Sequence, residues 1–168
     1  MGKAEGSWSG MRKYLEQEML AEPLRGRVRY NCTTYVGMDG CRIFEVYIDG
    51  RCFKQFSWET VNSYFLRTLQ NRKTSPLSIP EYWAGYRELL AKYPVNTRTE
   101  YTDGEFCQAL EEYRGHDIQT SICSGHPVVR MFAILDRRVG RRTLEKLKED
   151  MAKEPEWLQE IYSLRTSA

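Results

Sequence analysis

Arginine is the residue type in this chain that is best suited to recognise a charged ligand. Residues 126–144 hold five arginines and a single acidic residue, Asp136. A guanidinium group presents five donors in a planar fork, which suits carboxylate and phosphate recognition better than lysine does. The stretch therefore predicts an anion-binding surface, for nucleic acid or for an acidic face of another protein. Its arginines are Arg130, Arg137, Arg138, Arg141 and Arg142.

The same arginines also have a structural interpretation. If residues 127–140 form one helix that leads into the next, Arg137 lies one turn from Arg141 and Arg138 one turn from Arg142. Asp136 and the acidic centre of the chain can pair with some of these side chains, and water can cover the others. Solvated or internally paired charges are the more common arrangement on helices, so we favour the structural interpretation and keep the anion-binding surface as the alternative.

A second basic feature lies near the N-terminus, where Arg25, Arg27 and Arg29 recur at every second position. In a β-strand that spacing places all three side chains on one face. They can line one groove with the C-terminal arginines if the fold brings the two regions together. An exposed sheet face, where arginine discourages edge-to-edge pairing, is the interpretation that we favour.

Candidate catalytic residues are few. Cys107 with His116 and Asp117 has the residue types of a nucleophile, a base and an orienting acid, and Cys123 stands three positions before His126. These residues make a thiol-dependent enzyme one alternative, although nothing in the sequence brings them within hydrogen-bond reach. Buried reduced cysteines more often act as small apolar residues. We predict no catalytic residue, no metal site and no cofactor.

The five cysteines indicate a reducing environment. Their odd number and the absence of a Cys-x-x-Cys pair argue against both a disulfide framework and a structural zinc site. The first residues lack the apolar stretch of a secretory signal, and no apolar run is long enough to span a bilayer. We therefore expect a soluble cytoplasmic protein.

The composition is that of one folded domain. The chain has 168 residues, of which 41% are hydrophobic and 29% charged, with a net charge of +2. This hydrophobic share is too high for a disordered chain, and the near-neutral charge argues against indiscriminate nucleic-acid binding.

Aromatic side chains at 82, 83 and 86 (Tyr82, Trp83 and Tyr86) form either a recognition patch or part of a core.

Hydrophobic periodicity predicts the elements that must position these residues. Ser7 caps a helix that runs to about residue 21, and alternation of period two predicts strands at 25–34, 41–48 and 51–56. A turn at 37–40 and the Asp49-Gly50 hairpin signal connect the strands. Helices are expected at 58–70, from Pro80 onward, and at 103–115, 118–122, 127–140, 141–152 and 155–164.

The expected fold class is therefore α+β: an N-terminal helix, a three-stranded antiparallel meander, a helix, and a mostly helical C-terminal half. Residues 1–70 form the α-β-β-β-α unit, and residues 80–168 form a helical region packed on it. Together they make one compact domain, because the sheet needs one face covered by amphipathic helices.

Two segments carry a resemblance to a family. The segment Pro127-Val128-Val129-Arg130, followed by Ala133 and by residues 135–142 (Leu-Asp-Arg-Arg-Val-Gly-Arg-Arg), resembles the closing part of a family of small uncharacterised bacterial cytoplasmic proteins. The strand at 24–30 (Leu-Arg-Gly-Arg-Val-Arg-Tyr) is similar to the N-terminal part of the same family. The resemblance implies a bacterial cytoplasmic origin and carries no activity with it.

The sequence thus favours a non-enzymatic protein that binds a macromolecular partner. A protein partner fits best, with an inhibitor, immunity or regulatory role, because the chain is small, aromatic-rich and poor in catalytic groups. Binding of nucleic acid through the arginines is the alternative, and a thiol-dependent enzyme is the second alternative. The oligomeric state and the partner's identity do not follow from the sequence.

Overall fold

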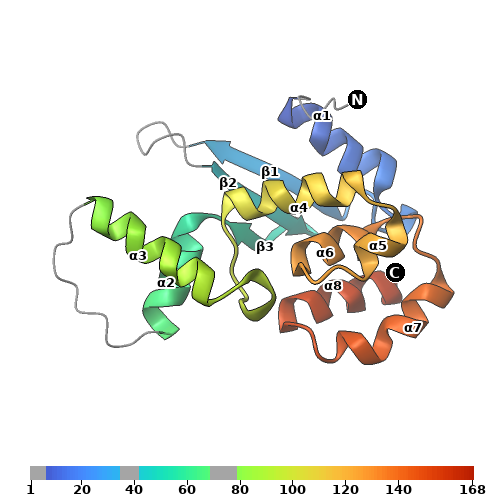
Figure 1. The fold of residues 1–168 in the computed structure, drawn as a ribbon. Coiled ribbons are helices and arrows are strands. Elements are labelled where there is room, and N and C mark those ends of the chain that lie inside the picture. Colours follow the sequence, from blue (N-terminus) through green and yellow to red (C-terminus); the bar gives the residue numbers. More distant parts are fainter. Residues whose placement is uncertain (1–6, 35–41, 69–78) are drawn as a thin grey trace.

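The computed structural model describes residues 7–34, 42–68 and 79–168, and it confirms the α+β fold class (Figure 1). The predicted turn at 37–40 lies outside these ranges. None of the helices within them is both long and apolar enough to cross a membrane.

The elements, in chain order, are α1 (Trp8–Lys13), the π-helix η1 (Tyr14–Met19), the 3₁₀ turn η2 (Glu22–Leu24), β1 (Val28–Thr34), β2 (Arg42–Ile48), β3 (Arg51–Phe56), α2 (Trp58–Thr68), α3 (Ile79–Lys92), the 3₁₀ turn η3 (Val95–Thr97), α4 (Asp103–Gly115), α5 (Ile118–Ile122), α6 (Pro127–Leu135), α7 (Arg141–Met151) and α8 (Glu156–Ser167).

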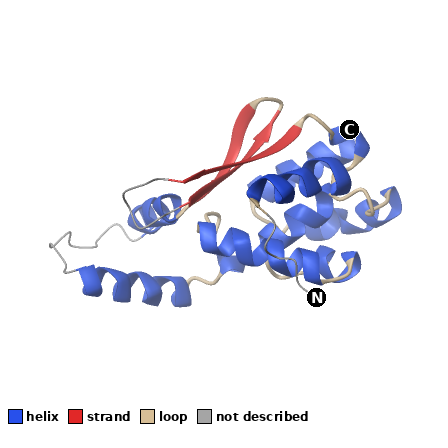
Figure 2. Ribbon diagram, turned by 90° about the horizontal axis from the view of Figure 1, so that it is seen from above, coloured by secondary structure: helices blue, strands red, loops and turns tan. Residues whose placement is uncertain are grey.

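The three strands form the predicted antiparallel meander, in the order β1-β2-β3. Asp49 and Gly50 join β2 to β3 with φ angles of 50° and 80°, the left-handed conformation that a two-residue hairpin turn requires. Alternation sends Val28 and Tyr30 into the core and leaves Arg29 exposed. Most of the helical half lies on one side of the sheet (Figure 2), so the other face is the wet face typical of antiparallel sheets.

The N-terminal helix changes geometry midway and protects an edge of the sheet. It begins at Trp8, with the Ser7 hydroxyl accepting from the backbone of Gly10, and continues as the π-helix η1. There the carboxylate of Glu16 accepts a hydrogen bond of 2.7 Å from the backbone N–H of Tyr30 on the edge strand β1. This contact occupies a donor that an open edge would offer to another chain.

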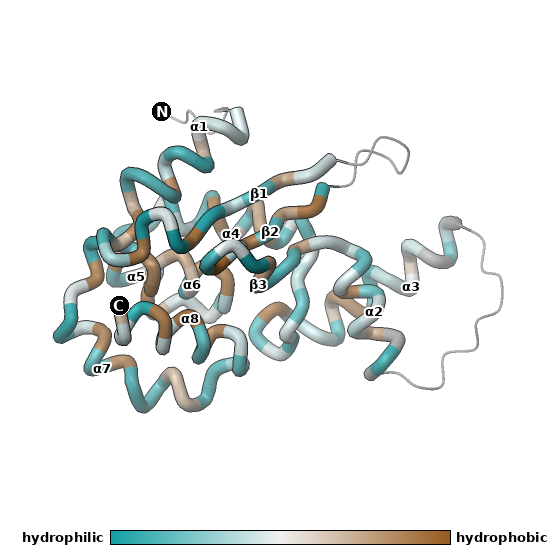
Figure 3. The backbone as a smooth tube through the Cα atoms, turned by 180° about the vertical axis from the view of Figure 1, so that it is seen from behind, coloured by the Kyte–Doolittle hydropathy of each residue, from teal (hydrophilic) through white to brown (hydrophobic). Residues whose placement is uncertain are grey.

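The centre of the helical half is α6, in which all nine residues are buried. Its residues other than Arg130 are apolar, so the helix must be surrounded, and α6 is packed by α4, α5 and α8. Phe132 of α6 contacts the rings of Phe106 and Tyr113 of α4. In Figure 3 the hydrophobic segments gather where these helices meet the sheet.

Helices α2 and α3 form a unit of their own, which we call the aromatic arm. It extends to one side of the molecule, away from α4 to α8 (Figure 1). Its buried residues Val61, Phe65 and Tyr86 form a hydrophobic cluster separate from the main core. The arm therefore holds together through its own side chains.

Two predicted elements have different bounds in the structure, which separates the predicted arginine rows. The helix that starts at Pro127 ends at Leu135, so Arg137 and Arg138 lie in the turn before α7 and do not stack one turn from Arg141 and Arg142. Asp136 ends the helix by accepting a hydrogen bond of 2.7 Å from the backbone N–H of Arg138. Asp136 also pairs through its backbone with the N-terminal segment at Leu20, a long-range contact that helical spacing cannot indicate.

The first strand is also shorter than predicted. It begins at Val28 because the 3₁₀ turn η2 and Gly26, with a φ angle of 80°, interrupt the extended chain. Arg25 therefore lies outside the strand, and Arg25, Arg27 and Arg29 do not form a row on one strand face.

Candidate binding sites

Arg130, the first arginine of the C-terminal cluster, is buried and committed to the protein itself. Its guanidinium pairs with the carboxylate of Glu154 and donates from Nε to the carbonyl oxygen of Ile122 at 3.1 Å. These contacts join the end of α5 to the turn between α7 and α8. Arg130 therefore stabilises the helical half and does not face a ligand.

Arg138 is also paired internally. The Asp136 side chain is fully buried and accepts from the Arg138 guanidinium at 2.6 Å and from the Tyr113 hydroxyl at 2.5 Å. The hydrogen bond to this carboxylate raises the pKa of Arg138, and burial raises the pKa of Tyr113. These contacts hold α4 against the turn between α6 and α7.

The other three arginines of the cluster are exposed. Arg137 lies in the turn before α7, and Arg141 and Arg142 lie in the first turn of that helix. Arg141 forms an ion pair of 3.2 Å with Glu145 one turn further on, and its side chain remains 92% exposed. An exposed pair of this kind contributes little to stability. The structure thus divides the predicted cluster into buried Arg130, Arg138 with a 41% exposed side chain that pairs with buried Asp136, and three further exposed arginines.

The N-terminal arginines are likewise divided. Arg27 forms two hydrogen bonds of 2.9 Å with Asp49 of the hairpin turn. Arg25 and Arg29 are exposed and line a shallow polar groove with Glu16 and Gln17. The groove lined by Arg25 and Arg29 includes no arginine of the C-terminal cluster, and the groove lined by Arg141 includes none of the three N-terminal arginines.

The predicted catalytic residue types do not converge. Cys107 lies within α4, whereas His116 is the exposed residue that ends this helix, about 13 Å further along its axis. The Asp117 carboxylate is used to cap α5. His126 accepts from the backbone N–H of Val128 through Nδ1 and thereby caps α6. Within the described residues no three His, Cys, Asp or Glu side chains are grouped as a metal site.

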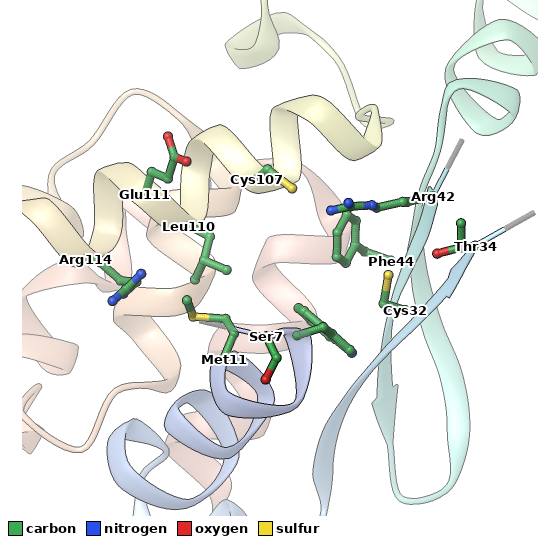
Figure 4. Close-up of a pocket in the computed structure, with 11 residues that line it drawn as sticks. Ser7, Met11, Cys32, Thr34, Arg42, Phe44, Cys107, Leu110, Glu111 and Arg114 are labelled. Atoms are coloured by element: carbon green, nitrogen blue, oxygen red, sulfur yellow. The ribbon is translucent and has the colours of Figure 1, made fainter. Parts of the chain in front are cut away.

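The structure places a half-open groove between α1, α4 and the adjoining ends of β1 and β2 (Figure 4). Its volume is about 480 Å³, within the range of small-molecule sites. The floor is apolar and comes from Trp8, Met11, Phe44 and Leu110. The Trp8 ring meets the Phe44 ring edge-on, with centroids 5.1 Å apart, so this floor is continuous with the main core.

Charged groups and thiols border this floor. The side chains of Arg42 and Arg114 reach toward the groove from β2 and α4, whereas the Glu111 carboxylate points away from it (Figure 4). The thiols of Cys32 and Cys107 lie at the same end as Arg42. Burial raises the pKa of both thiols, which keeps them protonated and poorly nucleophilic.

The aromatic arm offers a second surface. Trp58, Trp83 and Tyr86 pack together, with the two tryptophan rings 5.9 Å apart at their centroids. Trp83 is 39% exposed and is the large hydrophobic residue left on the surface among the residues with described side chains. Tyr86 is buried, and the Tyr82 side chain lies outside the described part of the chain.

Sequence patterns do not identify two groups of arginines that the structure makes important. Arg42 and Arg114 are separated in sequence and belong to a strand and a helix, so no local pattern links them. The other group is Arg98, which is 1% exposed and pairs with Glu105 while donating to the carbonyl oxygen of Tyr93 at 2.6 Å. An isolated arginine in an irregular segment gives no signal that it is buried.

The comparisons with known proteins give one match. A family model described as the SF0329 protein family matches residues 7–166, nearly the whole chain. No curated protein and no solved structure matches significantly.

Proposed function

The chain belongs to the SF0329 protein family, and we propose that it acts without catalysis, by binding a protein partner through the aromatic arm. The role is that of an inhibitor, an immunity protein or a regulator. The observation that carries the proposal is the position of the arm: a cluster of aromatic residues stands apart from the main core and leaves Trp83 exposed.

The outer face of α3 has the composition of a recognition surface. Trp83 and Arg87 are both exposed and lie one turn apart. Tryptophan and arginine are the residue types that most often dominate binding energy at protein interfaces. Two exposed alanines, Ala84 and Ala91, flank them on the same face and allow close approach of a partner.

The contacts of the cysteines and arginines support this proposal over its alternatives. A thiol-dependent enzyme needs an activated thiol and a nearby base, but burial raises the pKa of Cys107, and His116 lies at the other end of α4. A nucleic-acid surface built on the arginine cluster lacks the buried Arg130, and the Arg138 guanidinium is already paired with Asp136 although its side chain is 41% exposed.

The proposal includes a bacterial origin and a cytoplasmic location. Its support is the resemblance of the two segments at 24–30 and 127–142, together with the cysteines. The four described cysteines, Cys32, Cys52, Cys107 and Cys123, are all free thiols, the state that a reducing compartment maintains.

The test is affinity capture from the native host with the full chain and two single variants. Trp83→Ser removes the exposed ring, whereas Arg142→Ser changes an exposed residue of α7, outside the arm. We expect one protein to be retained by the wild type and by Arg142→Ser, and to be reduced at least tenfold with Trp83→Ser, because hot-spot residues are each worth 2 kcal/mol or more, on the order of a thirtyfold loss.

The opposite pattern would reject the arm as the binding surface: the same proteins retained by all three chains, or loss with Arg142→Ser alone. Retention of nucleic acid that is released by moderate salt and lost with Arg142→Ser would instead support the arginine-based alternative. Circular dichroism of both variants checks that their folds are intact.

A further inference from the structure

We propose that the groove between α1, α4 and the sheet is a binding site for an amphipathic carboxylate, a small molecule with an aliphatic chain and one acidic head group. The chain would lie on the floor formed by Trp8, Met11 and Leu110, and the carboxylate would pair with Arg42 (Figure 4). This site is distinct from the arm and does not depend on the proposed protein partner.

The lining of the groove favours an aliphatic chain over a peptide. A peptide presents a backbone donor and acceptor at each residue, and these groups must be satisfied when they are buried. Apart from Arg42, Glu111 and Arg114 at its border, the groove is lined by apolar side chains, two thiols and the neutral hydroxyl groups of Ser7 and Thr34. An aliphatic chain needs no such partners and gains from burial alone.

The charges of the groove favour an anionic head group. Arg42 and Arg114 direct their side chains toward the groove, whereas the Glu111 carboxylate points away (Figure 4). Arg114 stacks on the Tyr14 ring, with its guanidinium 5.6 Å from the ring centre. The Asp103 carboxylate, which does not line the groove, accepts from the backbone N–H of Arg42 at 3.4 Å. Among the described residues the Arg42 guanidinium itself has no hydrogen-bond or ion-pair partner, so its donors are available to a bidentate carboxylate.

The spacing along α4 sets the length of the ligand. Cys107, Leu110, Glu111 and Arg114 follow one another at helical spacing on the side that lines the groove. The stripe from Cys107 to Arg114 extends over about 10 Å. A medium-length aliphatic chain whose head group sits near Cys107 and Arg42 therefore reaches the Arg114 end.

The probes are octanoate, decanoate, decanol and decyltrimethylammonium, each titrated into the full chain by calorimetry at concentrations below micelle formation. Each buried methylene strengthens binding by about 0.8 kcal/mol, so we expect decanoate to bind on the order of tenfold more tightly than octanoate. Decanol, which lacks the charge, should bind at least tenfold more weakly than decanoate. Decyltrimethylammonium should show no saturable binding.

Two arginine variants test the head-group contact. Arg42→Gln should weaken decanoate binding about tenfold and leave decanol binding unchanged. Arg51→Gln changes an exposed residue of β3 that does not line the groove, and it should bind decanoate like the wild type. Because both arginines are exposed, neither variant removes core packing.

The thiols give a second, independent measurement. Cys32 and Cys107 line the groove, whereas Cys52 and Cys123 are exposed elsewhere. Saturating decanoate should slow iodoacetamide alkylation of Cys32 and Cys107 at least fivefold, followed residue by residue by peptide mass spectrometry. The alkylation rates of Cys52 and Cys123 should not change.

Three results would overturn the proposal: equal affinities for decanoate and decyltrimethylammonium, an Arg42→Gln variant that binds decanoate normally, or protection of all four cysteines alike. Each indicates nonspecific association with apolar surface. None of them bears on the protein partner, because that proposal is measured with Trp83 in the arm.

Discussion

At the scale of single residues, Arg137 and Arg138 show how far adjacent side chains can differ. Both residues are exposed, but the Arg138 side chain pairs with the buried carboxylate of Asp136. Arg137 engages the fold through its backbone N–H, which donates to the carbonyl oxygen of Met19 at 2.8 Å. Sequence alone makes the two residues equivalent. They should affect the free energy of unfolding differently, because only Arg138 pairs with the buried Asp136 carboxylate.

Replacement of these two arginines gives a prediction for the free energy of unfolding. Arg138→Gln leaves the Asp136 carboxylate buried without its cationic partner. Because the Arg138 side chain is itself 41% exposed, we expect a loss of about 2 kcal/mol, less than for a fully buried pair. Arg137→Gln should change the free energy of unfolding by less than about 0.5 kcal/mol, as exposed substitutions do. Urea unfolding of both variants measures the difference.

The prediction is contradicted if the two variants unfold at the same urea concentration. That result would mean that the Tyr113 hydroxyl and the backbone N–H of Arg138 are sufficient partners for the carboxylate. Asp136→Asn offers a check, because it removes the charge and keeps a similar shape. It should recover part of the stability when combined with Arg138→Gln.

At the scale of elements, the sequence predicts what local chemistry determines. Asp49 and Gly50 dictate the hairpin turn, and Thr102 with Glu105 forms a capping box that starts α4 where a helix was expected. Sequence periodicity does not predict the end of α6. The Asp136 carboxylate accepts locally from the backbone N–H of Arg138, and contacts with Leu20 and Tyr113 on distant elements hold it in place. The groove between α1, α4 and the sheet could not be predicted from the sequence either, because its lining residues come from segments that are far apart in the chain.

The irregular segment at 94–101 is another element that local patterns cannot describe. Buried Arg98 anchors it from within, and Lys54 of β3 donates to the carbonyl oxygen of Thr99 at 2.6 Å. The Lys54 ammonium also lies 4.8 Å from the Trp157 ring centre. These contacts attach residues 94–101, which lead from the arm to α4, to the main core.

The aromatic arm should open independently of the main core, because its hydrophobic cluster is separate. We predict that Phe65→Ala increases amide hydrogen exchange in α2 and α3 at least tenfold and leaves exchange in α4 and α6 unchanged. Local openings need break only the contacts of the unit that opens. Exchange measured by mass spectrometry at peptide resolution distinguishes the elements.

Phe132→Ala is the matched control for the arm. Phe132 lies in the main core and is 2% exposed, as is Phe65 in the arm cluster. Its loss should lower the global free energy of unfolding by about 3 kcal/mol or more and raise exchange in α4, α6 and the sheet. Faster exchange throughout the molecule in Phe65→Ala would show that arm and core unfold together.

At the scale of the whole molecule, the ionisable groups in the core set the response to high pH. Tyr30, Tyr101 and Tyr113 are at most 3% exposed, and burial raises the pKa of each phenol. Lys54 is shifted in the other direction, because burial lowers the pKa of its ammonium group. The contribution of Lys54 to the free energy of unfolding therefore increases as the pH rises towards 10.5, the ordinary lysine value, and stays constant above it.

The tyrosines predict cooperative alkaline unfolding. Their folded-state pKa values are raised, so the stability they contribute is complete below the unfolded value of about 10 and is lost as the pH rises above it. Three phenols that ionise only on unfolding lower the free energy of unfolding by about 4 kcal/mol per pH unit. Tyrosinate absorbance and circular dichroism should therefore change together above pH 10.

Two variants test this account of alkaline unfolding. Tyr30→Phe keeps the packed ring without the ionisable group and should move the midpoint of unfolding to higher pH, whereas Tyr64→Phe in the arm should leave the midpoint of the core unchanged. Ionisation of all tyrosines near pH 10 in a chain that keeps its near-ultraviolet dichroism would contradict this account.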